Sequence, residues 1–333
     1  LFLTGADEFS RHVYCFDTDT GQVRWQHVAE DIDGSPTENQ LPRVMEETGY
    51  AAPTATTNGR FIAAIFATGD LVCLTMEGER AWAKNLGIPL NHYGHASSLI
   101  SQDNLLFVQF DQKEDSKMLA FDFERGVIVW QVKRGEMSWS SPLLIDNGGR
   151  KELILTNSKT VESYDPQTGK KLWNVECLDG EVATSAAYAN GIVFVANEYA
   201  TAAAIDIRNH ESDPKILWTW NKVLPDSSSP LATEQHLILP SSFGAVTCLA
   251  ARTGEVLWEH DFDMGFSSSP IGVGNRVYLA DYSGNFQIFK LGSPFELLGT
   301  AEVGEDVLAT PAFVGDRIYI RGFNNLFCIA AGK

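Results

Sequence analysis

The sequence predicts an all-β fold, an eight-bladed β-propeller of four-stranded antiparallel blades, whose first and last blades are incomplete in this chain. Three features lead to this prediction. A hairpin that ends in tryptophan recurs along the chain. Each hairpin is preceded by a run of small residues, and a β-rich segment lies between that run and the hairpin. The recurrence has a period of roughly 40 to 57 residues, which brackets the period of four-stranded propeller blades.

The recurring hairpin is clearest in segment 15–25, CFDTDTGQVRW. Apolar alternation on both sides of a polar corner predicts two antiparallel strands, with Gly21 supplying the positive φ that a tight turn requires. The corner aspartate accepts backbone N–H groups, as in Asx turns. The motif tryptophans are Trp25, Trp82, Trp130, Trp173, Trp218 and Trp258, with Leu298 in the corresponding place of the following copy, and the corner aspartates are Asp17, Asp122, Asp165 and Asp206.

The other two features complete each repeat as strands A to D, with the tryptophan on strand D. Small residues begin strand A, as in SSSPLA (227–232) and SSSPIG (267–272), because the inner strands of neighbouring blades converge where bulky side chains would collide. The β-rich segment forms strand B. An indole on the outer strand buries about 150 to 250 Å² and keeps one N–H for a neighbouring backbone group, so we interpret the tryptophan as a contact between blades.

The blades are predicted to form one propeller domain over residues 1–333. Their approximate ranges are 1–28, 51–86, 95–134, 139–177, 183–223, 227–262, 267–303 and 309–333. The chain begins with strands B, C and D and ends with strands A, B and C, so the two ends cannot share one blade. We expect the two missing strands to lie upstream of Leu1.

The repeat resembles the tryptophan-docking motif, Ala-x-Asp-x-x-Thr-Gly-x-x-x-Trp, of the PQQ-type β-propellers, and the resemblance covers essentially the whole chain. This family includes quinoprotein alcohol dehydrogenases and the outer-membrane assembly lipoprotein BamB. In the dehydrogenases, the resemblance implies a quinone stacked between a tryptophan and a disulfide of adjacent cysteines, beside a calcium ion held by Glu, Asn and Asp. This sequence has no adjacent cysteines and lacks long insertions. We therefore expect no cofactor and no PQQ binding.

The net charge limits the kinds of partner that the protein can bind, and the positions of the cysteines limit the disulfides that it can form. The net charge of −18 repels phosphate backbones, so nucleic acid is excluded as a partner, and no apolar run is long enough to span a membrane. Cys15, Cys73, Cys248 and Cys328 occupy the same place in strand C of different blades, so we expect four buried thiols that are too far apart for disulfides. Cys177 has no evident partner. A monomer that binds a protein, a peptide or a carbohydrate is expected.

The expected binding surface is the rim of the channel where the D-to-A and B-to-C loops meet. Acidic residues such as Glu136, Asp263 and Asp306 lie there beside aromatic side chains, and aromatic anchors carry most binding energy at interfaces. The alternative is that these aromatics only pack the loops together. The residues predicted to bind a partner are Arg43, Tyr50, His92, Tyr93, His95, Trp139, Asp226 and Phe266.

No metal site is expected. His92 and His95 are three residues apart in a loop, and this spacing does not make two side chains converge, whereas structural zinc normally has four ligands. The segment that begins at Asp146, DNGGRKE, lacks the alternating oxygen ligands of a calcium loop and is predicted to be a hairpin turn.

Three classes of function are compatible with these features: a binding or scaffold propeller, a quinoprotein dehydrogenase, and a carbohydrate-active propeller. Only the first needs nothing beyond an exposed rim, so we expect a non-catalytic binding protein with no catalytic residues. The resemblance implies a periplasmic or secreted location, with a membrane anchor upstream of Leu1 as an alternative.

Overall fold

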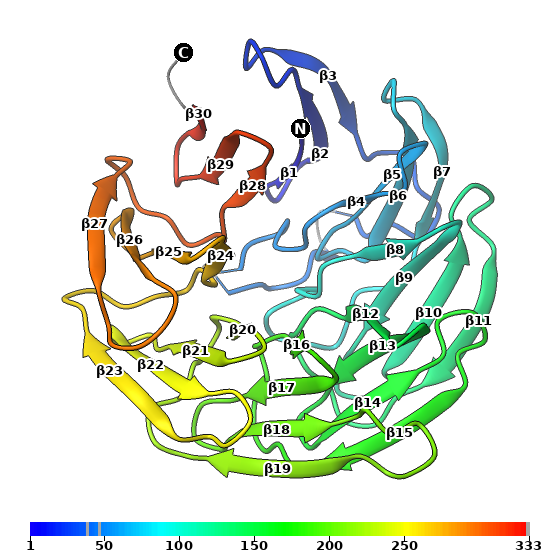
Figure 1. Ribbon diagram of the computed structural model, residues 1–333. Helices are drawn as coiled ribbons and strands as arrows, with labels where there is room; N and C mark the ends of the chain where they lie inside the picture. Colours follow the sequence, from blue (N-terminus) through cyan, green and yellow to red (C-terminus); the bar gives the residue numbers. More distant parts are fainter. Residues whose placement is uncertain (38–39, 46–47, 331–333) are drawn as a thin grey trace. The chain divides into compact units, whose positions relative to one another are not determined.

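The computed structural model describes residues 1–37, 40–45 and 48–330. The regular elements of these residues are strands, which form eight antiparallel sheets (Figure 1). Six sheets have four strands, and the first and last have three. The predicted fold class, an eight-bladed propeller with incomplete first and last blades, is confirmed. Within the described residues, no helix is long and apolar enough to cross a membrane.

The sheets follow the chain in order. The first three contain β1 (Phe2–Ala6), β2 (Arg11–Phe16) and β3 (Val23–Val28); β4 (Thr56–Thr57), β5 (Phe61–Ile65), β6 (Asp70–Thr75) and β7 (Arg80–Asn85); and β8 (Ile100–Gln102), β9 (Leu105–Phe110), β10 (Lys117–Asp122) and β11 (Ile128–Lys133). The next three contain β12 (Leu143–Asn147), β13 (Arg150–Thr156), β14 (Thr160–Tyr164) and β15 (Lys171–Glu176); β16 (Ala187–Ala189), β17 (Ile192–Ala196), β18 (Ala202–Asp206) and β19 (Lys215–Trp220); and β20 (Leu231–Ala232), β21 (His236–Pro240), β22 (Ala245–Ala250) and β23 (Val256–Asp261). The last two contain β24 (Ile271–Val273), β25 (Arg276–Ala280), β26 (Asn285–Lys290) and β27 (Leu297–Glu302); and β28 (Ala312–Val314), β29 (Arg317–Arg321) and β30 (Leu326–Ala330).

The chain divides into two compact units, and each is described by itself. Unit 1 contains Leu1–Leu144, Lys151–Ser158 and Ser163–Leu172, and unit 2 contains Ile145–Arg150, Lys159–Glu162 and the residues from Trp173 onward. Each unit has its own fully buried apolar core. Ile65, Leu71, Val108 and Phe121 belong to one core cluster of unit 1, and Phe194, Leu237 and Leu249 to one of unit 2.

Strand register shows which strands the three-stranded sheets contain. The pairing of strands C and D slips by one residue beside five of the motif tryptophans. Cys15 lies opposite Trp25 as Cys73 lies opposite Trp82. Strands β1 to β3 are therefore B, C and D.

In β26–β27 the same slip places Gly299 opposite Ile288. The alignment of Leu298 with the tryptophans is therefore wrong by one residue, because this corner is one residue longer.

Five of the motif tryptophans contact the C–D corner of the next sheet. The indole N–H of Trp25 donates to the carbonyl of Met76 at 2.9 Å, and a Cβ built on Gly78 would lie only 2.6 Å from that indole. The same hydrogen bonds run from Trp82 to Phe123, Trp130 to Pro166, Trp218 to Ala251 and Trp258 to Gly292. The ring of each of these five tryptophans therefore packs on the neighbouring sheet.

The corner aspartates organise the turns that the indoles pack against. Oδ1 of Asp17 accepts the N–H groups of Asp19 at 3.0 Å and Thr20 at 2.9 Å, together with the Thr20 hydroxyl. Asp165 makes the same three contacts in its own corner, Asp122 accepts the N–H of Arg125, and Asp206 accepts that of Arg208. These bonds satisfy donors that the strand ladders leave unpaired.

The small residues before strand A also have a hydrogen-bonding role. In unit 1 the N–H of Thr54 donates to the hydroxyl of Ser98 at 3.1 Å, and the N–H of Ser98 donates to Ser141 at 2.9 Å. In unit 2 the N–H of Ser229 donates to Ser269 at 2.9 Å in the same way. A hydroxyl that accepts from the preceding sheet explains why serine and threonine, and not alanine alone, recur there.

The cysteines differ from the prediction at one position. Cys15, Cys73 and Cys248 are buried free thiols in separate sheets, and Cys177 is half-buried. Cys328, predicted to be buried, is exposed. It lies on β30, the edge strand of the last three-stranded sheet, whereas the other strands C that carry cysteine are flanked by a strand D.

Candidate functional site

The B–C turns and the D–A loops lie at the same end of each sheet, because successive strands of a meander run antiparallel. Backbone hydrogen bonds tie them together. In unit 1 the N–H of Leu86 donates to the carbonyl of Gly69 at 2.9 Å, and in unit 2 the N–H of Phe262 donates to Gly244 at 3.0 Å. We call this the loop end, and all eight predicted binding residues belong to its loops.

Three predicted residues of unit 1 form an aromatic cluster. The ring of His92 lies 4.3 Å from Tyr93 and 5.6 Å from Trp139, and Tyr93 meets Trp139 edge-on at 5.2 Å. Trp139 is buried, and its indole N–H donates to Oδ1 of Asn91 at 2.7 Å. His92 is exposed at the surface of the cluster. A buried indole therefore holds an exposed imidazole in a fixed place.

Arg43 and Tyr50 belong to the long loop between β3 and β4, which lies partly outside the described residues. Arg43 is exposed, whereas Tyr50 is half-buried and donates its hydroxyl to the carbonyl of Pro42 at 3.1 Å. Thr48 donates to the carbonyl of Tyr93 at 3.2 Å. The structure thus places this loop against the cluster.

His95 and Phe266 belong to the interior. His95 is 3% exposed and stacks on Phe110 at 5.7 Å, and burial lowers the pKa of its imidazole to about 4. Phe266 is 0% exposed and packs edge-on against Phe262. Both lie where a D–A loop turns inward toward strand A, so neither side chain can contact a partner.

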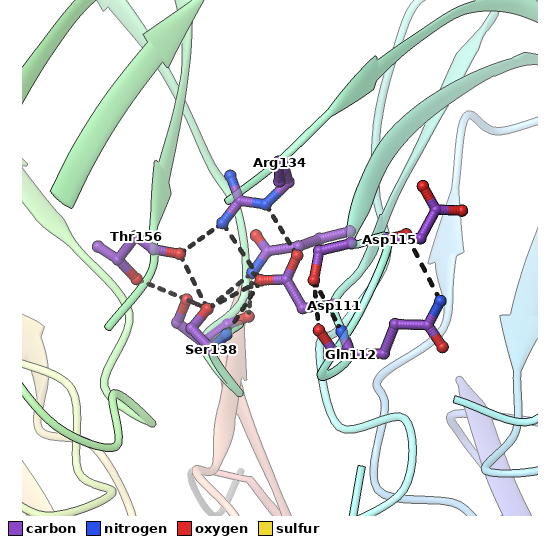
Figure 2. A network of polar contacts seen from close by, with 9 residues as sticks. Asp111, Gln112, Asp115, Arg134, Ser138 and Thr156 are labelled. Atoms are coloured by element: carbon purple, nitrogen blue, oxygen red, sulfur yellow. Dashed lines mark hydrogen bonds and ion pairs between the residues drawn. The ribbon is translucent and has the colours of Figure 1, made fainter. Parts of the chain in front are cut away.

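The loop that carries Trp139 is fixed by a buried polar network, which Figure 2 shows. Nε of Arg134 donates to Oδ1 of Asp111 at 2.8 Å, and its Nη2 donates to the carbonyl of Thr156 at 2.7 Å. The N–H of Ser138 donates to Oδ2 of Asp111 at 3.1 Å. Both members of the ion pair are almost fully buried. Since Ser138 directly precedes Trp139, the network fixes the backbone from which the Trp139 indole projects.

The two sequence segments weighed as metal sites lie at His92–His95 and at Asp146. His92 is exposed while His95 is buried, and in the described ranges no group of three or more His, Cys, Asp or Glu side chains could hold an ion. Asp146 accepts the N–H of Gly149 at 2.7 Å as part of a hairpin turn. A quinone site does not fit these residues either, because each cysteine stands alone in a different sheet or loop.

Unit 2 holds Asp226, the last predicted residue, in an acidic group. The side chain of Asp226 is exposed overall. Partial loss of solvent around its carboxyl, and then repulsion from Glu181, raise the pKa of that carboxyl. Burial and the charge of Asp226 raise the pKa of Glu198, while a hydrogen bond from Tyr199 acts in the opposite direction. The charge of Asp226 is therefore coupled both to Glu181 and to Glu198.

Sequence reasoning missed two aromatic residues of unit 2 beside this acidic group. Tyr199 and Phe243 occupy the B–C turns of the fifth and sixth sheets and are 92% and 75% exposed. They line one groove of about 470 Å³ with residues 221–224 of the intervening D–A loop. The available signal was a single aromatic in each B–C turn from the fifth to the eighth sheet, namely Tyr199, Phe243, Tyr282 and Phe323.

Comparison with known proteins gives consistent family matches. A family model described as outer membrane protein assembly factor BamB matches residues 10–146, 157–239 and 211–291. The chain is 23% identical over 256 residues to the outer membrane protein assembly factor BamB of Shewanella oneidensis, which covers 74% of this chain and 62% of that protein. It is 21% identical over 200 residues to BamB of Legionella pneumophila, covering 56% of this chain and 49% of that protein. The chain thus spans less than two thirds of the curated relatives it matches.

Solved structures show the same fold. BamB from Moraxella catarrhalis superposes with a TM-score of 0.74 at 16% identity, covering 98% of this chain and 92% of that one. A europium-containing methanol dehydrogenase also gives 0.74, at 11% identity, covering 96% of this chain and 80% of that one. At these identities the likeness shows the fold alone, since one propeller architecture carries many functions.

Proposed function

Because this chain belongs to the family of the outer membrane protein assembly factor BamB, we propose that it is a non-catalytic scaffold that binds a protein partner during outer membrane protein assembly. The partner contacts the loop end. The location that fits this role is outside the cytoplasm, on the periplasmic side of the outer membrane.

The observation that carries the proposal is the aromatic cluster of His92, Tyr93 and Trp139. A buried indole that is hydrogen-bonded to Asn91 keeps the exposed imidazole in place, so little side-chain entropy is lost on binding. Leu90, which is exposed, extends the apolar surface beside it. Rigid aromatic and apolar anchors of this kind carry most of the binding energy of protein interfaces.

The net charge of the protein indicates the charge of the partner. The net charge of −18 favours a basic or amphipathic partner, and exposed charges are screened over about 10 Å at 0.1 M salt. The association should therefore weaken as salt increases, mainly through a slower on-rate.

Site-specific photocrosslinking tests this function. A photoreactive residue at position 92 should capture an outer membrane assembly component in cells of the source organism. The same residue at position 125, in the C–D corner at the opposite end of the third sheet, should not. Leu90→Ala/His92→Ala should weaken the complex by about tenfold or more, whereas the control Arg125→Ala/Val127→Ala should not. Capture from position 125 alone would show that the loop end is the wrong surface.

A further inference from the structure

We propose that the groove between Tyr199 and Phe243 binds an extended, lysine- or arginine-bearing segment of a partner polypeptide. This inference rests on the proposed function, because it assigns a second contact of the loop end, in unit 2, and the chemistry of what binds there.

The groove presents three exposed apolar side chains, Tyr199, Phe243 and Val223, beside Leu224, which is buried in the core of unit 2. Tyr199 and Phe243 project from neighbouring B–C turns, and Val223 and Leu224 of the D–A loop lie between them. Tyr199 and Phe243 are both mostly exposed and line the same groove, and contiguous exposed apolar patches mark interaction sites. The arrangement provides two anchors with an apolar floor.

Hydrogen bonds made by Asn197 and Ala200 fix the turn that carries Tyr199. Asn197 is almost fully buried and donates to the carbonyl of Asp179 at 2.7 Å, and the N–H of Ala200 donates to the carbonyl of Asn197 at 3.2 Å. Tyr199 itself has a φ of +61°, a conformation that is costly for a bulky residue. Strained residues persist where the surrounding structure fixes them, and they concentrate at binding sites. This turn therefore holds the phenol ring outward.

The charges around the groove select a cation. Glu198 is in the groove wall, and its neighbours Asp226 and Glu181 add two further carboxylates. Burial, and then the charges of Asp226 and Glu198, raise the pKa of Tyr282. Lys222 is the one cationic residue among those that line the groove. A bound ammonium or guanidinium group would relieve the repulsion between these carboxylates, whereas a phosphate or an anionic lipid would increase it.

The spacing of anchors suits an extended segment. In an extended chain, alternate side chains point to the same side about 6 to 7 Å apart, so apolar side chains can contact the aromatic anchors while the intervening basic side chains turn toward the acidic wall. A groove of about 470 Å³ is large enough for two or three such side chains. We therefore assign a segment in which basic and apolar residues alternate.

The test uses three fluorescent peptides with the whole chain, measured by fluorescence anisotropy at low and moderate salt. The probe is Ser-Lys-Phe-Lys-Phe-Lys-Ser, and the two comparison peptides replace its lysines with glutamate or its phenylalanines with serine. Wild type should bind the probe at least about tenfold more tightly than either comparison peptide, and the affinity should fall with salt.

Two variants locate the binding. Tyr199→Gly/Phe243→Ser should weaken probe binding by about tenfold or more, and glycine at a positive φ keeps the turn folded. Phe9→Ser is the matched control, because Phe9 is 76% exposed in the B–C turn of the first sheet, outside the groove. Glu198→Gln/Asp226→Asn should weaken binding and reduce its salt dependence.

The outcomes are decisive for this inference separately from the proposed function. Absence of wild-type binding, equal binding of the glutamate peptide, or an equal loss in Phe9→Ser would overturn the groove assignment. Crosslinking from position 92 would be unaffected by that result, so the scaffold function would stand. If crosslinking fails while the groove variants behave as expected, the groove assignment stands and the assembly role falls.

Discussion

Four glycines of C–D corners, Gly78, Gly126, Gly169 and Gly254, have both a backbone role and a packing role. Gly169 has a φ of +69°, and a Cβ there would lie 2.6 Å from Cε3 of Trp130. Gly274, in the A–B turn of the seventh sheet, has a φ of +61° and no atom within 4 Å of its position for a Cβ. The two glycines share a backbone conformation and differ in the indole contact.

Alanine at these two positions separates the roles. Gly274→Ala should lower the free energy of unfolding by about 1–2 kcal/mol, the cost of a left-handed alanine. Gly169→Ala should lower the free energy of unfolding by about 1–3 kcal/mol more than Gly274→Ala does, because Trp130 must shift. Urea denaturation measures both. Equal losses would show that the indole does not constrain the corner.

Removal of the indole itself has a larger effect. Trp130→Ala should destabilise the protein by about 3–5 kcal/mol, as expected for a large buried aromatic, while Trp130→Phe should retain much of the packing and lose the bond to Pro166. Urea melts that show a loss below about 1 kcal/mol for Trp130→Ala would mean that this side chain does not hold neighbouring sheets together.

His95 makes stability depend on pH. Its folded pKa of about 4 lies below the ordinary value near 6.5, so the unfolded chain takes up a proton first as pH falls. Stability should therefore be lost between pH 6.5 and pH 4, by about 3 kcal/mol from this residue. His95→Phe keeps the stack on Phe110 and should show less loss over this range. His210→Gln, at an exposed histidine, is the control, and identical pH profiles for His95→Phe and wild type would contradict this assignment.

At the scale of elements, the third sheet depends on one buried ion pair. Arg134 follows β11, Asp111 follows β9, and Thr156 ends β13, so the network of Figure 2 joins three strand ends. Removal of one member of such a pair leaves an uncompensated buried charge, which costs more than the pair contributes. The network therefore fixes the D–A loop that positions Trp139.

Single and double substitutions test that account. Arg134→Met should reduce stability by about 3–5 kcal/mol, and Asp111→Asn/Arg134→Met should recover part of the loss because the stranded carboxylate is gone. Thermal and urea unfolding give both values, and near-ultraviolet circular dichroism should report the displacement of Trp139. The stranded-charge explanation would be refuted if the double variant lost more unfolding free energy than the two single variants lose together.

At the scale of the whole molecule, the propeller fold is shared with a quinoprotein-type enzyme. The methanol dehydrogenase superposes over 96% of this chain, yet Cys15, Cys73 and Cys248 lie one to a sheet and cannot form a disulfide of adjacent cysteines. Architecture alone thus does not supply a cofactor pocket.

Calorimetry tests the expectation that no quinone binds. Titration with PQQ and calcium should give no heat beyond dilution. The control is a quinoprotein dehydrogenase titrated under the same conditions. A micromolar dissociation constant that a loop-end substitution abolishes would overturn the expectation and reopen the enzymatic alternatives.

The sequence by itself determined the features that depend on contacts close in the chain. The tryptophan of strand D lies ten residues after its partner on strand C, as Cys15 and Trp25 show, so the repeat, the corner aspartates and the blade count could all be inferred from spacing. Only tertiary structure decided which side chains are exposed. Phe266 and His95 are buried and Cys328 is exposed, because burial depends on neighbouring sheets that no local pattern specifies. The groove of Tyr199 and Phe243, residues 44 positions apart in sequence, forms only when adjacent B–C turns are brought together.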